Sequence, residues 1–221
     1  MDETNAEVEE SETFAAALAA MKRDGSVLLT TGASVGTLRS ACQRLLGDTA
    51  TTPRRRLFVL TEQVGPDHPA RTGGPGDHVR TLNYRTQTRS AATTASGPQA
   101  GHDRIVTGDL SDLYAAIEAE VTDAERDARN LEPAQLRVCL DSLDTVLAAH
   151  GQEETFTFLH EFRALIRGAD GMAHVHLPAA MDDAVVGVLT PLFDAVIEVR
   201  EGPQQRWHLR EPEFTTDWLS L

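Results

Sequence analysis

A stretch with the layout of a phosphate-binding site occupies residues 26–46, SVLLTTGASVGTLRSACQRLL. Its apolar start, central glycines and amphipathic end predict a strand, a turn and a helix. A Walker A loop at such a position reads G-x-x-x-x-G-K-[ST], and its lysine reaches the β- and γ-phosphates. Aligning Gly36 with the second glycine puts Thr37 at the lysine position, whereas aligning Gly32 with the first puts Arg39 at the hydroxyl position. Neither register restores the motif, so ATP turnover by the usual P-loop mechanism is not expected.

The same stretch could still bind an anion. A helix N-terminus that follows a turn presents free backbone N–H groups to a phosphate. Arg39 could supply the missing charge, although its guanidinium is larger than an ammonium and differently shaped. Gly32, Gly36, Thr37 and Arg39 are therefore the candidate nucleotide- or phosphate-binding residues.

Two carboxylates lie at the ends of predicted strands. The run LRVCLD ends at Asp141, and an apolar strand followed by an acid is the Walker B pattern, in which the acid holds Mg²⁺ through water. Capping of the next helix is the alternative role for Asp141. Glu62, near the end of the predicted strand at 56–63, could orient an attacking water or could simply be a polar strand end. Asp141 and Glu62 are the candidate catalytic residues, and Asp141 is the candidate Mg²⁺ ligand.

The remaining candidates for metal chemistry are histidines and cysteines. His174 and His176 alternate along a predicted strand at 171–178, so they share a face and could ligate a metal. No third ligand is evident near them in the sequence. Cys42 on a helix and Cys139 in a strand are interpreted as small buried hydrophobes, and their placement predicts neither a disulfide nor a zinc site.

Apolar strands alternate with amphipathic helices along most of the chain, which predicts an α/β fold with three layers, a mainly parallel sheet between helices. Ligands of such sheets bind at the carboxyl ends of the strands. Residues 1–10 are expected to be disordered, 11–221 to form a single domain, and 64–104 to contain loop insertions with an edge strand at 79–88. The last strands predict a C-terminal β-hairpin.

The composition limits the partners and the setting. The chain of 221 residues carries 34 acidic against 20 basic residues, a net charge of −14, and Lys22 is its only lysine. An acidic surface of this kind keeps a protein hydrated at high salt, so the composition indicates a halophilic, haloarchaeal source. The charge opposes binding to nucleic acid or anionic lipid. With no apolar run of about 18 residues and no secretory signal, a cytoplasmic protein without membrane contact is expected.

Several stretches resemble a haloarchaeal family of RecA-superfamily, KaiC-like proteins. They are RVCLDSL, FTFLHEFRALIR, HVHLP and LTPLFDAVIEV, and the likeness is strongest over residues 136–200. The resemblance implies a RecA-type P-loop fold and a role in signal transduction. It places Asp141 at the Walker B acid and Glu62 at the catalytic carboxylate, with Gln63 in place of the second acid. The Walker A lysine has no counterpart.

A retained core without the lysine favours a non-catalytic regulatory or signal-transduction module, a pseudo-ATPase that acts through contacts with other proteins and needs no cofactor. The alternative is a nucleotide-binding sensor, or an atypical ATPase, that uses ATP and Mg²⁺ with a lysine-less phosphate loop. A homo-oligomer would favour the alternative, since RecA relatives often place the nucleotide between subunits.

Overall fold

The computed structural model describes residues 3–47, 53–62, 68, 70, 78–86, 103–202 and 204–221. The strands are β1 Ser26–Thr31, β2 Arg55–Leu60, β3 His78–Arg85, β4 Asp103–Thr107, β5 Leu136–Asp141, β6 Met172–Leu177, β7 Ala195–Arg200, β8 Gln204–Leu209, β9 Phe214–Thr215 and β10 Leu219–Ser220. The helices are α1 Glu3–Arg23, α2 Val35–Leu45, α4 Leu110–Ala128, α5 Leu143–Gly168 and α6 Ala184–Leu189, with a 3₁₀ turn η2 Thr190–Leu192.

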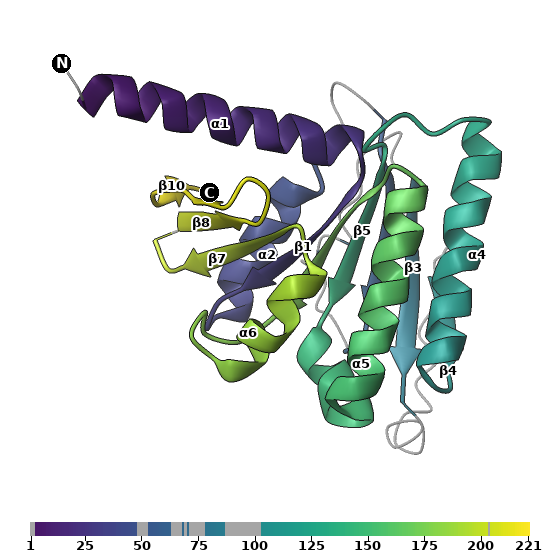
Figure 1. The fold of residues 1–221 in the computed structure, drawn as a ribbon. Helices are drawn as coiled ribbons and strands as arrows, with labels where there is room; N and C mark the ends of the chain where they lie inside the picture. Colours follow the sequence, from purple (N-terminus) through teal and green to yellow (C-terminus); the bar gives the residue numbers. More distant parts are fainter. Residues whose placement is uncertain are drawn as a thin grey trace.

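The strands form one mixed sheet in the order β10-β8-β7-β1-β6-β5-β2-β3-β4, with β9 paired to β8 (Figure 1). The strands from β7 to β4 in this order run parallel to one another. β8 returns antiparallel to β7, so the predicted C-terminal hairpin is confirmed. The predicted α/β class with a mostly parallel sheet is confirmed as well. Parallel strands need long crossover connections, which are usually helices.

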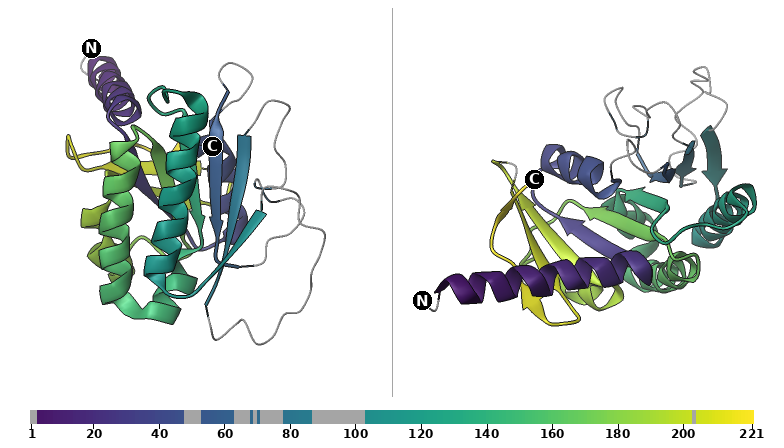
Figure 2. Two further views of the ribbon diagram at one scale, coloured as in Figure 1. Left: turned by 90° about the vertical axis from the view of Figure 1, so that its right-hand side faces the viewer. Right: turned by 90° about the horizontal axis from the view of Figure 1, so that it is seen from above.

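Helices cover both faces of the sheet (Figure 2). One face packs against α4, α5 and α6 around a large apolar core that includes Val59, Val138 and Phe162. The other face carries α2, whose Cys42 and Leu46 pack with Phe58 and Cys139. α1 lies along the end of the sheet from which β3 and β5 begin, opposite their carboxyl ends (Figure 1).

Local sequence signals explain how individual elements begin. Asp109 caps α4, because its carboxylate accepts hydrogen bonds from the backbone N–H groups of Ser111 at 2.9 Å and Asp112 at 3.1 Å. α1 begins at Glu3, ahead of the domain start expected at residue 11. Residues 3–10 contain neither glycine nor proline to stop a helix. The disorder expected for residues 1–10 stays a prediction.

The strand predicted at the sheet edge within 79–88 is internal. β3 pairs with β2 on one side and with β4 on the other, and β4 is the edge strand. The partial polar alternation of β3 suggested exposure, but the alternation cannot reveal that a later strand adds outside it. Most other residues predicted as loops within 64–104 lie outside the described part of the chain.

No helix in the described ranges is both long and apolar enough to cross a membrane.

The core predicts a sharp contrast between two phenylalanines of α5. Phe162 is fully buried, whereas Phe156 is 41% exposed. We expect Phe162→Ala to lower the free energy of unfolding by about 3–5 kcal/mol, since it leaves a cavity in the core. Phe156→Ala should change it by less than about 0.5 kcal/mol. Urea unfolding followed by circular dichroism measures both, and equal losses would show that α5 does not pack as described.

Candidate functional site

The sequence-predicted acids and Arg39 meet at the carboxyl ends of the central strands. A small cavity of about 80 Å³ opens there between the start of α2 and the ends of β2, β5 and β6. Arg39, Glu62 and Asp141 all line it, so the structure brings these three candidates together. The other lining residues are Val35, Leu38, Ser142, Asp144, His176 and Pro178.

Asp141 is held between two buried histidines. One carboxylate oxygen lies 2.9 Å from His68 Nε2, and the other lies 3.2 Å from His176 Nδ1. Burial alone would raise the pKa of Asp141, but the hydrogen bonds from His176 and His68 outweigh it and lower the pKa well below its usual value. Asp141 is therefore an ionised carboxylate with both oxygens engaged by protein groups.

The loop between β1 and α2 is short. Only residues 32–34 separate Thr31, the last residue of β1, from Val35, the first residue of α2. The hydroxyl of Thr37 donates to the backbone carbonyl of Ser34 at 2.7 Å, which occupies that hydroxyl within the helix start. Thr37, Gly32 and Gly36 are not among the residues that line the cavity.

Gly32 has a packing role. A Cβ atom at this position would lie 2.6 Å from the carbonyl oxygen and 2.7 Å from the Cγ2 of Val199 in the neighbouring strand β7. Any larger residue would therefore push β7 away from the loop at Gly32. A Cβ at Gly36 would meet nothing closer than the Ser34 hydroxyl at 3.6 Å, so that position has room.

The other charged residues of the cavity have distinct surroundings. Glu62 accepts a hydrogen bond from the Thr145 hydroxyl at 3.1 Å, which ties the end of β2 to the first turn of α5. Arg39 places its Nε in a buried position, and this atom has no hydrogen-bond partner within the described residues. Gln63, at the expected place of a second acid, lies outside the described residues.

A buried cluster of thiols and imidazoles adjoins Asp141. Cys139 of β5 pairs in register with His174 of β6. Because side chains alternate along strands, Cys139 shares its face with Asp141, and His174 shares its face with His176. α2 brings Cys42 onto the same face, with its Sγ 3.5 Å from Cys139 Sγ and 3.2 Å from His174 Nε2.

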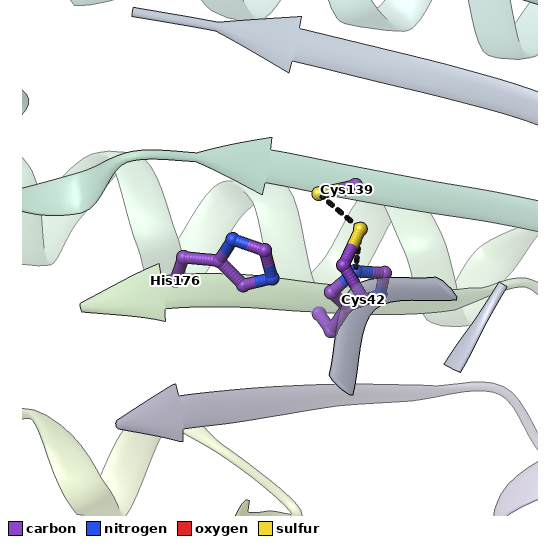
Figure 3. Close-up of side chains that lie close together, drawn as sticks. Cys42, Cys139 and His176 are labelled. Carbon is purple, nitrogen blue, oxygen red and sulfur yellow. Dashed lines mark hydrogen bonds between the residues drawn. The ribbon is translucent and has the colours of Figure 1, made fainter. Parts of the chain in front are cut away.

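These four side chains are close enough to act together. The ligand atoms of Cys42, Cys139, His174 and His176 all lie within 4.8 Å of one another, and all four residues are buried. Figure 3 shows Cys42, Cys139 and His176 close together. The interpretation that the two histidines lack further ligands nearby is therefore wrong, because both cysteines lie beside them. The prediction that the cysteines form no zinc site stays a prediction. Thiolates and imidazoles are the ligands that zinc takes in proteins.

The protonation of the cluster reflects its burial and its internal contacts. Burial alone would raise the pKa of Cys42, but hydrogen bonds with Cys139 and His174 and the charge of His174 lower it well below the usual value. Burial and the neighbouring Cys42 raise the pKa of Cys139. Burial also lowers the pKa of His174. His176 is the exception, since its bond to Asp141 overcomes burial and raises its pKa to about 9.

Sequence reasoning missed the cysteines because it treated each as a lone apolar residue. The pattern did contain a partial signal. Cys139 and Asp141 alternate on one strand just as His174 and His176 alternate on another. Two such pairs on neighbouring parallel strands would share a face, but the neighbour relation of β5 and β6 is a property of the tertiary structure.

Gly32 and Gly36 allow a direct test of the close packing between the β1–α2 loop and β7. We expect Gly32→Ala to lower the free energy of unfolding by about 1–3 kcal/mol, because the new methyl group overlaps Val199. Gly36→Ala, inside α2, should be neutral or stabilising by up to about 1 kcal/mol. Denaturant unfolding measures both variants, and a Gly32→Ala protein as stable as the parent would contradict the close approach to β7.

Comparison with known proteins adds a family without a known role. No curated protein matches the chain. Residues 25–199, which include the whole cavity lining and all four members of the buried cluster, match the model of a family of unknown function, DUF7504. The chain belongs to this family.

Proposed function

We propose that the chain is a non-catalytic regulatory or signal-transduction module that acts through contacts with other proteins. The observation that carries the proposal is the state of Asp141, whose two carboxylate oxygens are both engaged by histidines. A Walker B acid must face the nucleotide site to hold Mg²⁺ through water. The carboxylate of Asp141 instead contacts two buried histidines, His68 and His176.

The size of the cavity supports the same proposal. Small-molecule sites usually enclose about 300–1,000 Å³. The cavity beside Asp141 has about 80 Å³, and residues 32–34 alone form the turn that would cradle a phosphate. The small volume and the absence of a lysine from this turn both support a module that does not turn over a nucleoside triphosphate.

A RecA/KaiC-like scaffold is part of the proposal. Support comes from the sheet order around the centre, β7-β1-β6-β5-β2-β3, and from the antiparallel hairpin that extends the sheet beyond β7. The resemblance of residues 136–200 to KaiC-like proteins points the same way. A scaffold of this kind could retain its shape for protein recognition after losing its catalytic residues.

One observation favours the alternative, a nucleotide sensor or an atypical ATPase. Arg39 lies in the cavity lining with Glu62 and Asp144, and its Nε is buried without a hydrogen-bond partner in the described residues. A guanidinium group in this position could receive a phosphate, and the neighbouring carboxylates could hold a divalent ion. ATP and Mg²⁺ would then be the ligands, and the site would be shared between subunits if the protein oligomerises.

The composition of the chain supports a proposal about its source organism and its location in the cell. We propose a halophilic, haloarchaeal and cytoplasmic protein, on the strength of a net charge of −14 and a single lysine, Lys22. At molar salt the surface charges are screened to within a few ångströms, so a carboxylate-rich surface can approach a partner without strong repulsion.

Titration of ATP with Mg²⁺ into the full chain tests the proposal. We expect no heat of binding up to millimolar ATP in molar potassium chloride, and no phosphate release above the buffer rate. The reason is that no group in the turn replaces the lysine. Isothermal titration calorimetry and a phosphate-release assay provide the two readings.

Micromolar binding would overturn the non-catalytic proposal in favour of the alternative. In that case Arg39→Ala should abolish binding, while Glu62→Gln should abolish hydrolysis and leave binding in place. Arg44→Ala is the matched control, since Arg44 lies in the last turn of the same helix and does not line the cavity.

A further inference from the structure

The buried cluster contains four metal-ligand side chains from three separate elements. Cys42 comes from α2, Cys139 from β5, and His174 and His176 from β6. Zinc bond lengths and a tetrahedral angle require about 3.3–3.8 Å between ligand atoms. The two sulfurs, 3.5 Å apart, lie at that spacing, the 3.2 Å from His174 Nε2 to Cys42 Sγ is just below it, and no pair exceeds 4.8 Å.

His176 carries an unsatisfied atom that faces this cluster. Its Nδ1 is bonded to Asp141, whereas its Nε2 is buried and has no hydrogen-bond partner in the described structure. The residue is only 1% exposed, so water does not readily satisfy that atom. The ring extends toward Cys42 (Figure 3). A buried ring nitrogen without a hydrogen-bond partner beside two sulfurs is an incomplete arrangement, and a metal ion would complete it once that nitrogen has released its proton.

The surroundings of His176 are those of a metal ligand. Metal-binding histidines almost always donate their other ring N–H to a carboxylate or carbonyl, which orients the ring and raises its basicity. Asp141 accepts that bond from His176 Nδ1, and His68 in turn holds the second oxygen of Asp141. The engagement of Asp141, unexplained by nucleotide chemistry, is what a supporting carboxylate would do.

We propose that Cys42, Cys139, His174 and His176 bind one Zn²⁺ ion in a closed, structural site. Two thiolates and two neutral imidazoles suit a tetrahedral zinc centre and disfavour Mg²⁺ or Ca²⁺, which take oxygen ligands. The two thiolate charges balance the dication, which allows the ion to be buried without a net charge. The protons that the ligand atoms hold in the absence of metal leave to solvent.

The site would clamp α2 to the two central strands. All four positions are at most 3% exposed, so no coordination position is open to a substrate, and the ion is expected to enter as the chain folds. This inference does not depend on the proposed regulatory function, since a structural ion at this place is compatible with either reading of the cavity.

Metal analysis of the unmodified full chain is the first test. The protein is produced in zinc-supplemented medium, purified under reducing conditions, and analysed by inductively coupled plasma mass spectrometry. We expect about one zinc ion per chain. After unfolding with a chelator, refolding with Co²⁺ should give the intense visible absorption of a tetrahedral thiolate-bound ion. Excess zinc at about 100 times its dissociation constant should raise the Tm of the metal-free protein by about 5–10 °C.

Variants then test the ligand assignment. Cys42→Ser, Cys139→Ser, His174→Asn and His176→Asn should each abolish stoichiometric zinc and the cobalt absorption. Asp141→Asn should weaken zinc binding about 10–100-fold, because His176 loses the group that orients it. His150→Asn is the matched control, since His150 bonds Tyr84 at 2.8 Å, is partly buried and lies outside the cluster. It should keep full metal content.

Four results would overturn the proposal. The first three are zinc-free protein with reduced thiols, Co²⁺ absorption without thiolate ligation, and a Tm that zinc leaves unchanged. A fourth is a Cys42–Cys139 disulfide in place of the metal, detected by intact mass as the loss of two hydrogens. Since these readings use the parent protein, a variant that fails to fold does not obscure the outcome.

Discussion

The alternation of side chains along two neighbouring parallel strands is the constraint on which the site depends. β5 and β6 run in register, with Cys139 opposite His174. The pleat then places these two residues, and Asp141 and His176 two residues further along, on one face of the sheet. A slip of one residue in either strand would turn its pair toward α5 and separate the carboxylate from the imidazole.

Two histidines engage the carboxylate of Asp141 at this part of the sheet. Asp141 stands where a strand-end carboxylate could hold a divalent ion through water, yet it lies between two buried imidazoles. Hydrogen bonds of this kind, from charged or polarised donors in a buried setting, are among the stronger polar contacts in proteins. The carboxylate therefore links β5, β6 and His68, while it also lines the small cavity together with Arg39 and Glu62.

Much of the fold could be predicted because its signals are local. Alternating apolar strands and amphipathic helices predicted the α/β class, and the spacing of the last strands predicted the antiparallel hairpin. Asp109 was recognisable as a helix cap from its place before an apolar periodic run. The errors fall where long-range pairing decides. β3 carries the partly polar pattern of an edge strand but lies inside the sheet, because β4 adds beyond it after a long connection.

The sequence by itself determined which residues could do chemistry and that the loop after the first strand contains no lysine. The missing lysine, the acids at strand ends and the two histidines that share a face all follow from residue types at fixed local spacing. Only the tertiary structure decided that Cys42 meets Cys139, 97 residues away, and His174, 132 residues away. The order of the strands and the packing of α2 on the sheet set those distances. Both depend on the burial of apolar surface over the whole core, and no local pattern near the cysteines encodes them.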